Sequence, residues 1–450
     1  MENAESGSDF GRTNRGGIEV SALGKRIEPF RALMFNREIA GEPARVVAPP
    51  YDLIGAARQH QLYDRSPYNI VRLEFGREPD RYGAAEKTLA EWMAAGVLQR
   101  PARPAIFHYR QTFDVEGRLL HRTGFIARVR LEEFDRGHIL PHEKTFPAAK
   151  EDRLRLLTAL QVNTSPIFGL YSGAHPELDR LRERVSSREP LIDLVDDLGI
   201  RNELRPIEAD DDIAIVQREL EAPRILIADG HHRYETALNY RRARRQANTS
   251  SELQPFDYTM MTLVACDDPG LVILPTHRVV KSLPADAIAT FAQRARELFN
   301  VEEIAHRDEF RMRLNDHGTG AIGVTLKRQS NYLILQLRDE SAMKAAMPDA
   351  APEVRRLDVS ILHALVFDRI FRLRADEIRK GGNIEYTIEI GGALGAVAQG
   401  HADGAFLMNP PSISDVERVS DAGATMPEKS TYFHPKLLTG LVMNPLFDDK

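Results

Sequence analysis

Apolar positions along this chain follow two periods, one of two residues and one between three and four residues. Residues 105–113 and 122–131 alternate between apolar and polar side chains on either side of Glu116 and Gly117, which predicts an antiparallel hairpin. Short and nearly continuous apolar runs predict buried strands over residues 165–171, 225–228 and 260–266. These runs indicate a sheet with a well-covered interior.

Helical spacing separates these strands. It predicts helices over residues 82–95, 151–161, 177–185 and 212–220, and another that starts just after residue 230. Two segments near the N-terminus are also predicted as strands: residues 45–50, where the apolar run stops at two prolines, and residues 69–74. Strands and helices that alternate in this way predict an α/β fold of mixed α+β type.

A length of 450 residues exceeds what one hydrophobic core usually organises, so two or three domains are expected. Residues 1–25 are predicted as a disordered tail, residues 26–283 as the main α/β domain, and residues 381–450 as a segment that returns to it. Residues 284–380 are predicted as a second, smaller α+β domain or an insertion. Helices are expected over residues 286–298 and 359–371, and a pair of strands over residues 321–326 and 332–337.

The overall charge narrows the range of partners. Lysine and arginine number 60 and aspartate and glutamate 66, which gives a net charge of −6. This balance argues against nucleic acid or an anionic membrane as a partner. The expected partner is a small-molecule substrate. Cys266 is the single cysteine, so neither an intramolecular disulfide nor a cysteine-based zinc site is expected. No signal peptide or long apolar run is visible, so a cytoplasmic location is expected.

The first candidate site lies where the strand at 225–228 ends. Gly230 permits a tight turn, and the helix that follows would offer unpaired N–H groups and partial positive charge to an anion. Arg233 would grip two phosphate oxygens, and it is expected to be partly exposed and therefore unimportant for folding. His231 and His232 would move a proton, and His231 is also a possible phosphorylated nucleophile.

Asp229 ends this strand and has several possible roles. It would act as a base, orient a histidine, or hold a magnesium ion. A purely structural interpretation also fits the segment, because Asp-Gly is a common turn after a strand and Asp229 would then only cap the helix.

The second candidate site is a polar loop around residues 140–145. His142, Glu143 and Lys144 place a base, a carboxylate and a cation outside regular structure. Glu143 would be the general base or a magnesium ligand, and Lys144 would neutralise phosphate charge. An exposed charged loop without a function is the alternative.

Two lysines near the C-terminus are a third candidate. Lys429 and Lys436 flank hydroxyl and apolar side chains, which suits an anion clamp or a substrate lid and equally suits a solvated hairpin. Lesser candidates are Tyr51, Asp52, Lys150, Arg153 and residues 276–278. The sequence contains no Walker phosphate-binding loop, nucleophile elbow or zinc-protease helix.

Several separated motifs resemble one known family over roughly residues 30–445. They include Val47-Ala-Pro-Pro-Tyr-Asp52, Ser66-Pro-Tyr-Asn-Ile-Val-Arg-Leu-Glu74, Leu140-Pro-His-Glu-Lys-Thr145, Ala228-Asp-Gly-His-His-Arg-Tyr-Glu-Thr-Ala237 and Met426-Pro-Glu-Lys-Ser-Thr-Tyr-Phe-His-Pro-Lys436. On these motifs the chain is identified as a member of the domain of unknown function 1015 family, whose name implies no activity.

A shorter resemblance concerns the motif that begins at Asp229. It is similar to the glycine turn of the ParB/sulfiredoxin-like superfamily, which includes free-serine kinases and nucleotide-binding partition proteins. This resemblance implies a ParB/sulfiredoxin-like core and phosphate binding at Gly230. His231 stands where sulfiredoxins carry a cysteine, which excludes their chemistry, and the DNA-reading helices of partition proteins have no counterpart.

Two hypotheses follow. The first is a phosphotransferase or phosphatase that uses ATP or ADP with Mg²⁺ and acts on a small hydroxy compound; the resemblance implies serine or phosphoserine. Asp229, His231, His232 and Glu143 would be catalytic, and the nucleotide would bind at Gly230, Arg233, Lys144, Lys429 and Lys436. The second is a non-catalytic nucleotide-binding regulator of the ParB type. The metal and the oligomeric state stay open.

Overall fold

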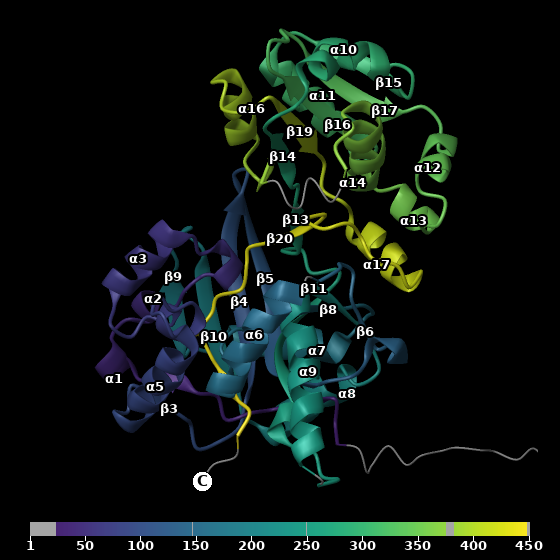
Figure 1. Ribbon diagram of the computed structural model, residues 1–450. Helices are drawn as coiled ribbons and strands as arrows, with labels where there is room; N and C mark the ends of the chain where they lie inside the picture. The colour runs from purple at the N-terminus through teal and green to yellow at the C-terminus, as the bar shows by residue number, and fades with distance from the viewer. Residues whose placement is uncertain (1–23, 146, 249, 375–381, 448–450) are drawn as a thin grey trace, which may run out of the picture.

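A large mixed sheet organises the computed structural model, which describes residues 24–145, 147–248, 250–374 and 382–447 (Figure 1). The predicted tail over residues 1–25 lies almost entirely outside the described residues. The strand order is β6-β11-β8-β12-β5-β4-β10-β9, with β1 added beside β5. The bounds are β1 Ile27–Glu28, β4 Ile106–Val115, β5 Arg118–Arg130, β6 Ile139–Leu140, β8 Ile167–Tyr171, β9 Ile192–Val195, β10 Arg201–Ile207, β11 Ile225–Asp229 and β12 Tyr258–Ala265.

Alternation along the strands divides the side chains between the two faces of this sheet. In β5, Phe125 and Ala127 join one buried cluster, and Ile126 between them joins another. Helices α7 (Pro176–Ser186), α8 (Asp210–Glu219) and α9 (His231–Ala247) contribute to the first cluster. The predicted hairpin is confirmed as β4 and β5, and Glu116 and Gly117 both take positive φ in its turn.

Both strands predicted near the N-terminus are wrong. Residues 43–46 form the short helix α2 (Pro43–Val46), and residues 71–74 form α4 (Val71–Glu74). Asn69 explains the second error, because its side chain is buried and bonds three backbone groups. It donates to the carbonyls of Arg45 and Val47 and accepts from the amide of Val71. These contacts close a local turn and stop the alternating pattern from extending into a strand.

Helices from the N-terminal part of the chain cover one edge and one side of the large sheet. The helices α1 (Arg37–Ala40), α3 (Ala56–Arg65) and α5 (Arg81–Ala94) belong to this region, and Trp92 of α5 lies in its buried cluster. Helix α6 (Pro147–Leu160) packs against both α5 and α9. The predicted helices over 82–95 and 151–161 are therefore confirmed as α5 and α6, the second starting four residues earlier.

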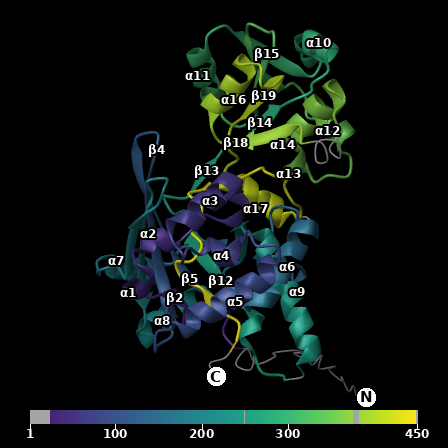
Figure 2. The ribbon, with the colours of Figure 1, turned by 60° about the vertical axis from the view of Figure 1, so that its left-hand side comes forward.

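A second sheet has six antiparallel strands and stands apart from the first in both ribbon views (Figures 1 and 2). Its order is β15-β17-β16-β19-β14-β18. The bounds are β14 His277–Val280, β15 Phe299–Ile304, β16 Ala321–Leu326, β17 Tyr332–Leu337, β18 Ile384–Thr387 and β19 Gly404–Met408. Helices α10 (Ala285–Ala295), α11 (Arg307–His317), α12 (Ser341–Ala346), α13 (Pro352–Arg355), α14 (Asp358–Ile361), the π-helix Leu362–Ile370, α16 (Ile390–Ala398) and α17 (Ile413–Asp421) accompany it.

This second sheet is wider than the predicted block of residues 284–380. It takes β14 from before the block and β18 and β19 from after it. The strand pair at 321–326 and 332–337 is confirmed, whereas β15 and α11 were not predicted. The division of the chain into domains stays a prediction.

Short strand pairs carry the C-terminal segment back along the large sheet. Strand β20 (Tyr432–His434) pairs with β13 (Val272–Leu274), and β21 (Asn444–Pro445) pairs with β7 (Val162–Asn163). Two residues near the N-terminal end, β2 (Met34–Phe35), pair with β3 (Leu98–Gln99). Within the described residues, none of the helices has the length and apolar character that a membrane span requires.

Candidate functional site

The predicted strand-turn-helix is present at Gly230. Strand β11 is buried and ends at Asp229, Gly230 takes φ 92° and ψ 27°, and α9 begins at His231. Only glycine adopts this left-handed conformation without a steric penalty, which is why the turn is so short. The first amide groups of α9 therefore lie directly beside the end of β11, the second strand from one edge of the large sheet.

Asp229 forms two ion pairs at this turn. Its Oδ1 lies 3.0 Å from Nζ of Lys436, and its Oδ2 lies 2.9 Å from a terminal nitrogen of Arg233. Burial alone would raise the pKa of this carboxyl, but the two cations outweigh burial and hold it well below its usual range. Asp229 is thus a permanent anion that is already neutralised by protein groups.

Arg233 is held by the protein on several sides. One terminal nitrogen donates to the hydroxyl of Ser165 at 3.1 Å and to the carbonyl of Pro166 at 2.5 Å, while the other bonds Asp229. Its side chain is only 15% exposed. Arg233 is thus partly exposed, as expected, but its guanidinium is bound by residues just before β8 and at the end of β11 and is not surrounded by water. The small effect on folding expected from the sequence stays a prediction.

His142 and His231 form a buried pair next to the turn. The amide of His142 donates to Nε2 of His231 at 3.2 Å, and the ring centroids lie 4.6 Å apart. Nδ1 of His142 lies 2.6 Å from the carbonyl of Ile227, an acceptor, so this nitrogen carries the proton. Nε2 then accepts from the hydroxyl of Thr431 at 2.9 Å.

Both histidines of this pair are neutral. Burial lowers the pKa of His142 to about 4, and burial together with the neighbouring His142 lowers the pKa of His231 well below its usual value. Because Nε2 of His231 accepts the His142 amide, its proton sits on Nδ1. This arrangement suits a hydrogen-bond donor through Nδ1 better than a phosphorylated nucleophile, since the Nε2 lone pair is already engaged.

Glu143 follows His142 and faces the same turn. Its Oε1 accepts the backbone amide of Lys429 at 3.1 Å, and residue 143 forms a parallel bridge with Met426. Burial raises the pKa of Glu143, although this amide and the Lys429 cation partly oppose the rise. A carboxyl of raised pKa with one oxygen left over is suited to accept a proton.

The two predicted loops converge on one cleft of about 80 Å³, as expected. Its lining residues come from four separate segments: Tyr51, Asp52, Glu143, Lys144, Asp229, Gly230, His231, His232, Arg233 and Lys429. Burial lowers the pKa of His232, which favours its neutral form. Lys436 does not line the cleft and reaches the site through Asp229. His142 and the lesser candidates Lys150, Arg153 and residues 276–278 do not line it either.

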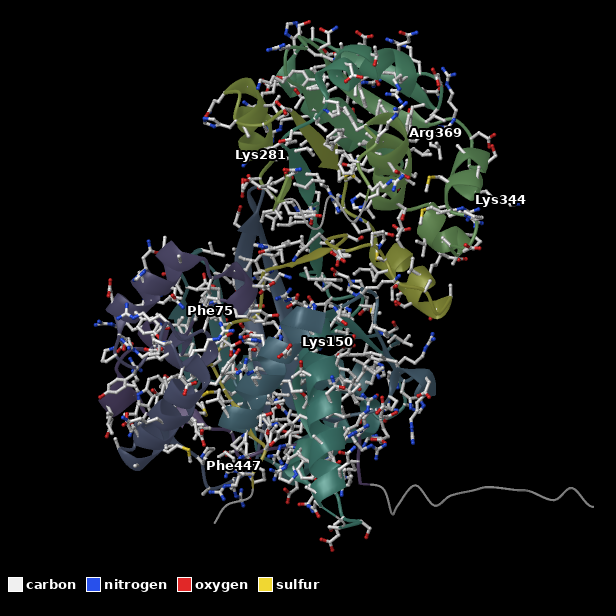
Figure 3. All side chains as sticks on the ribbon, viewed as in Figure 1. Phe75, Lys150, Lys281, Lys344, Arg369 and Phe447 are labelled. Atoms are coloured by element: carbon white, nitrogen blue, oxygen red, sulfur yellow. The ribbon has the colours of Figure 1, made fainter. Side chains whose placement is uncertain are left out.

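Glu235 explains why the polar loop meets α9, and the sequence did not indicate it. One carboxylate oxygen accepts the hydroxyl of Thr145 and the other accepts Nζ of Lys150, both at 2.7 Å. Figure 3 labels Lys150 where α6 runs beside α9. Lys150 is thus a tether between loop and helix, which corrects its prediction as a phosphate ligand.

Arg153 is also structural. It is buried, lies 3.1 Å from the carboxylate of Glu74 and 2.6 Å from that of Asp152, and stacks over the ring of Tyr51 at 4.1 Å. The predicted hairpin around residues 429–436 is not solvated either. Phe433 in β20 is fully buried, and Thr431 bonds His142.

A larger groove adjoins this cleft. It encloses about 670 Å³ between the elements of the second sheet and residues 424–428, and Lys144 lines both hollows. Among the described residues, no cluster of three or more histidine, cysteine or acidic side chains is placed to hold a metal ion.

Comparison with known proteins places the chain in a family without an assigned activity. The family model described as "Protein of unknown function (DUF1015)" matches residues 27–360. A search of curated proteins found no match.

Three solved structures share a distant likeness. A conserved hypothetical protein from Pyrococcus furiosus is 14% identical with a TM-score of 0.34, and the match covers 69% of this chain and 94% of that protein. A free serine kinase in complex with AMP is 13% identical with a TM-score of 0.32, and the match covers 69% of this chain and 91% of the kinase. SbnI from Staphylococcus aureus, with a C-terminal truncation, is 13% identical with a TM-score of 0.34, and the match covers 72% of this chain and 90% of SbnI.

Proposed function

The chain belongs to the DUF1015 family, and we propose that it is a phosphate-handling enzyme. It binds a nucleotide through its phosphates at the start of α9 and moves a phosphoryl group to or from a small hydroxy compound. One observation carries the proposal: the N-terminus of α9, the carboxyl of Glu143 and the cations of Lys144 and Lys429 border a single cleft.

The anion-binding side of this cleft consists of α9 and two lysines. The first-turn amides of His231, His232 and Arg233 have no acceptor within their own helix, and they carry the positive end of its dipole. Within the described residues, neither Lys144 nor Lys429 forms an ion pair, so both ammonium groups are available to a phosphate. Arg233 lines the same cleft with its charge partly offset by Asp229.

Glu143 is the best candidate for the general base. A base that removes a hydroxyl proton must bind that proton well, and the raised pKa of Glu143 meets this need. Asp229 does not, because its pKa is depressed and both oxygens are paired with cations. Asp229 instead orients Arg233 and Lys436, and the neutral His231 donates a hydrogen bond from Nδ1 without releasing the proton.

The two hollows divide the ligand between them. A cleft of about 80 Å³ accepts a phosphoryl group, and the adjoining groove of about 670 Å³ accepts the rest of a nucleotide. ATP or ADP with Mg²⁺ is the proposed cofactor, with Asp52 or Glu143 as a metal ligand. The turn motif at Gly230 and its resemblance to the ParB/sulfiredoxin-like core favour serine or phosphoserine as the hydroxy compound.

The test is phosphoryl transfer by the full chain. Purified protein is incubated with ATP, Mg²⁺ and serine, and in the reverse direction with ADP and phosphoserine, and the products are followed by ³¹P nuclear magnetic resonance. Formation of phosphoserine or ATP that is lost in Glu143→Gln and kept in Glu86→Gln supports the proposal, since Glu86 is exposed on α5. Nucleotide binding without transfer identifies a regulator instead, and no binding refutes the proposal.

A further inference from the structure

A second cavity, of about 420 Å³, lies at the lower edge of the second sheet. It is bordered by β17, β19, α13, α14 and the start of α17, and α17 lies against α13 (Figure 1). It shares no lining residue with the phosphate cleft. Its apolar wall includes Met343, Val359 and Met408.

Asp358 is the unusual group of this cavity. Both of its carboxylate oxygens accept the amide of Gly320, at 2.9 and 3.0 Å. Within the described residues it has no cationic partner, and a second carboxyl, that of Asp415, faces it from α17. Burial and, to a smaller extent, Asp415 raise the pKa of Asp358 to about 7 against the Gly320 amide. A half-buried carboxylate without a cation is costly.

The other charges of the cavity are already engaged. Arg356 pairs with Glu340 at 3.2 Å, Asp415 pairs with Arg418 and caps the start of α17 through Ser412, and Arg338 donates to Asn300. The cavity thus presents an apolar wall and, among its described residues, one half-buried carboxyl without a cationic partner, that of Asp358.

One polar atom in the cavity wall also lacks a hydrogen-bond partner among the described residues, Nε of Arg278. Arg278 is 1% exposed. One of its terminal nitrogens donates to the carbonyl of Lys429 at 2.9 Å, and the amide of Lys429 donates to Glu143. This wall therefore touches the residue that positions Glu143.

We propose that this cavity is a second ligand site, for a small organic molecule that carries a primary ammonium group. The ammonium pairs with Asp358, and the apolar body lies against Met343, Val359 and Met408. A charge-assisted contact of this kind supplies the missing cation. The site does not depend on phosphate chemistry in the other cleft.

Binding of the ammonium ligand is coupled to the release of one proton from Asp358. An ammonium that pairs with protonated Asp358 displaces its proton to solvent, so affinity rises as the pH passes upward through about 7. It falls again when the amine itself loses its charge. The charged groups that line the same cavity as Asp358 are Arg278, Arg338, Asp339, Glu340, Arg355, Arg356 and Asp415.

The experiment compares amines with matched alcohols by isothermal titration calorimetry on the full chain. The probes are butylamine, 1,4-diaminobutane and 2-phenylethylamine, set against 1-butanol, 1,4-butanediol and 2-phenylethanol. We expect at least one amine to bind about tenfold more tightly than its alcohol at pH 8, and more weakly at pH 6.

Two variants locate the binding. Asp358→Asn keeps an oxygen for the Gly320 amide but removes the charge, and it is expected to lose the preference for the amine about tenfold. Glu340→Gln is the matched control, because Arg356 already neutralises Glu340 at the rim. Thermal melts check folding, and Asp358→Ser replaces Asp358→Asn if the latter unfolds. Equal binding of amines and alcohols, or an amine preference that survives in the tested aspartate variant, overturns the proposal.

Discussion

Nζ of Lys436 lies 3.0 Å from Oδ1 of Asp229, although 207 positions separate the two residues in the chain. The lysine side chain is 11% exposed and also lies 4.6 Å from the centre of the Tyr432 ring. Burial works against the charge of Lys436, yet Asp229 outweighs it and raises the pKa of the ammonium. The pair therefore fixes the C-terminal segment to the end of β11, directly before the turn at Gly230.

Removing this lysine is expected to destabilise the fold. Lys436→Met retains much of the length without the charge, and it leaves Asp229 with Arg233 as its single cation. We expect a loss of roughly 3 kcal/mol in the free energy of unfolding, measured by urea denaturation. Asp229→Asn combined with Lys436→Met is expected to restore part of it. Unchanged stability with weaker nucleotide binding would instead make Lys436 a phosphate ligand.

Arg233 is expected to affect both stability and binding. Arg233→Ala removes bonds to Asp229, Ser165 and Pro166, so a loss of about 2–4 kcal/mol is expected in unfolding experiments. ADP affinity is expected to fall at least tenfold. Arg233→Lys is expected to recover only a part of both losses, because an ammonium cannot reproduce the planar fork. Full recovery by lysine would contradict this account.

Glu143→Gln is expected to separate chemistry from binding. The amide side chain still accepts the Lys429 amide but cannot take a proton. We expect kcat to fall about 10²- to 10⁴-fold, while the Kd for ADP changes less than about threefold. Steady-state kinetics and calorimetry on the same preparations provide both numbers. A large change in the Kd with little change in kcat would assign Glu143 to ligand or metal binding.

Gly230→Ala tests the turn itself. A methyl group at this position would lie 3.0 Å from Nε of Arg233, and the backbone has φ 92°. We expect a loss of at least about 1–2 kcal/mol in stability, together with weaker nucleotide binding as α9 shifts. Gly117→Ala in the β4–β5 turn is the matched control, because its φ is 79° but no atom lies near. Equal effects on nucleotide binding in the two variants would exclude a special role for Gly230.

Acid is expected to destabilise the protein through its buried histidines. The pKa of His142 falls from about 6.5 in the unfolded chain to about 4 in the fold, so the unfolded state binds the extra proton first. This contribution is complete above pH 6.5 and is lost as the pH falls towards 4, by roughly 3 kcal/mol. Urea denaturation at pH 7, 5.5 and 4.5 measures it. His142→Gln is expected to flatten the curve, and an unchanged pH dependence would show that His142 does not contribute.

The sequence by itself determined the elements whose patterns are local. The alternating residues around Glu116 and Gly117 gave the β4–β5 hairpin, and the apolar run before Asp229 gave β11 and the start of α9. A period of two or of three to four residues depends on which faces are buried, and Gly230 is required by its own φ. These features do not need knowledge of distant contacts.

Only the tertiary structure decided the features that depend on contacts between residues far apart in the chain. Asn69 bonds carbonyls at residues 45 and 47 and thereby turned a strand-like pattern into α4. The six-stranded sheet recruited strands on both sides of the predicted block, because antiparallel partners are chosen by packing. Glu235 binds the polar loop and α6 to α9, and Asp229 forms ion pairs with both Lys436 and Arg233. Such charges pair according to distance in space, which the order of residues along the chain does not fix.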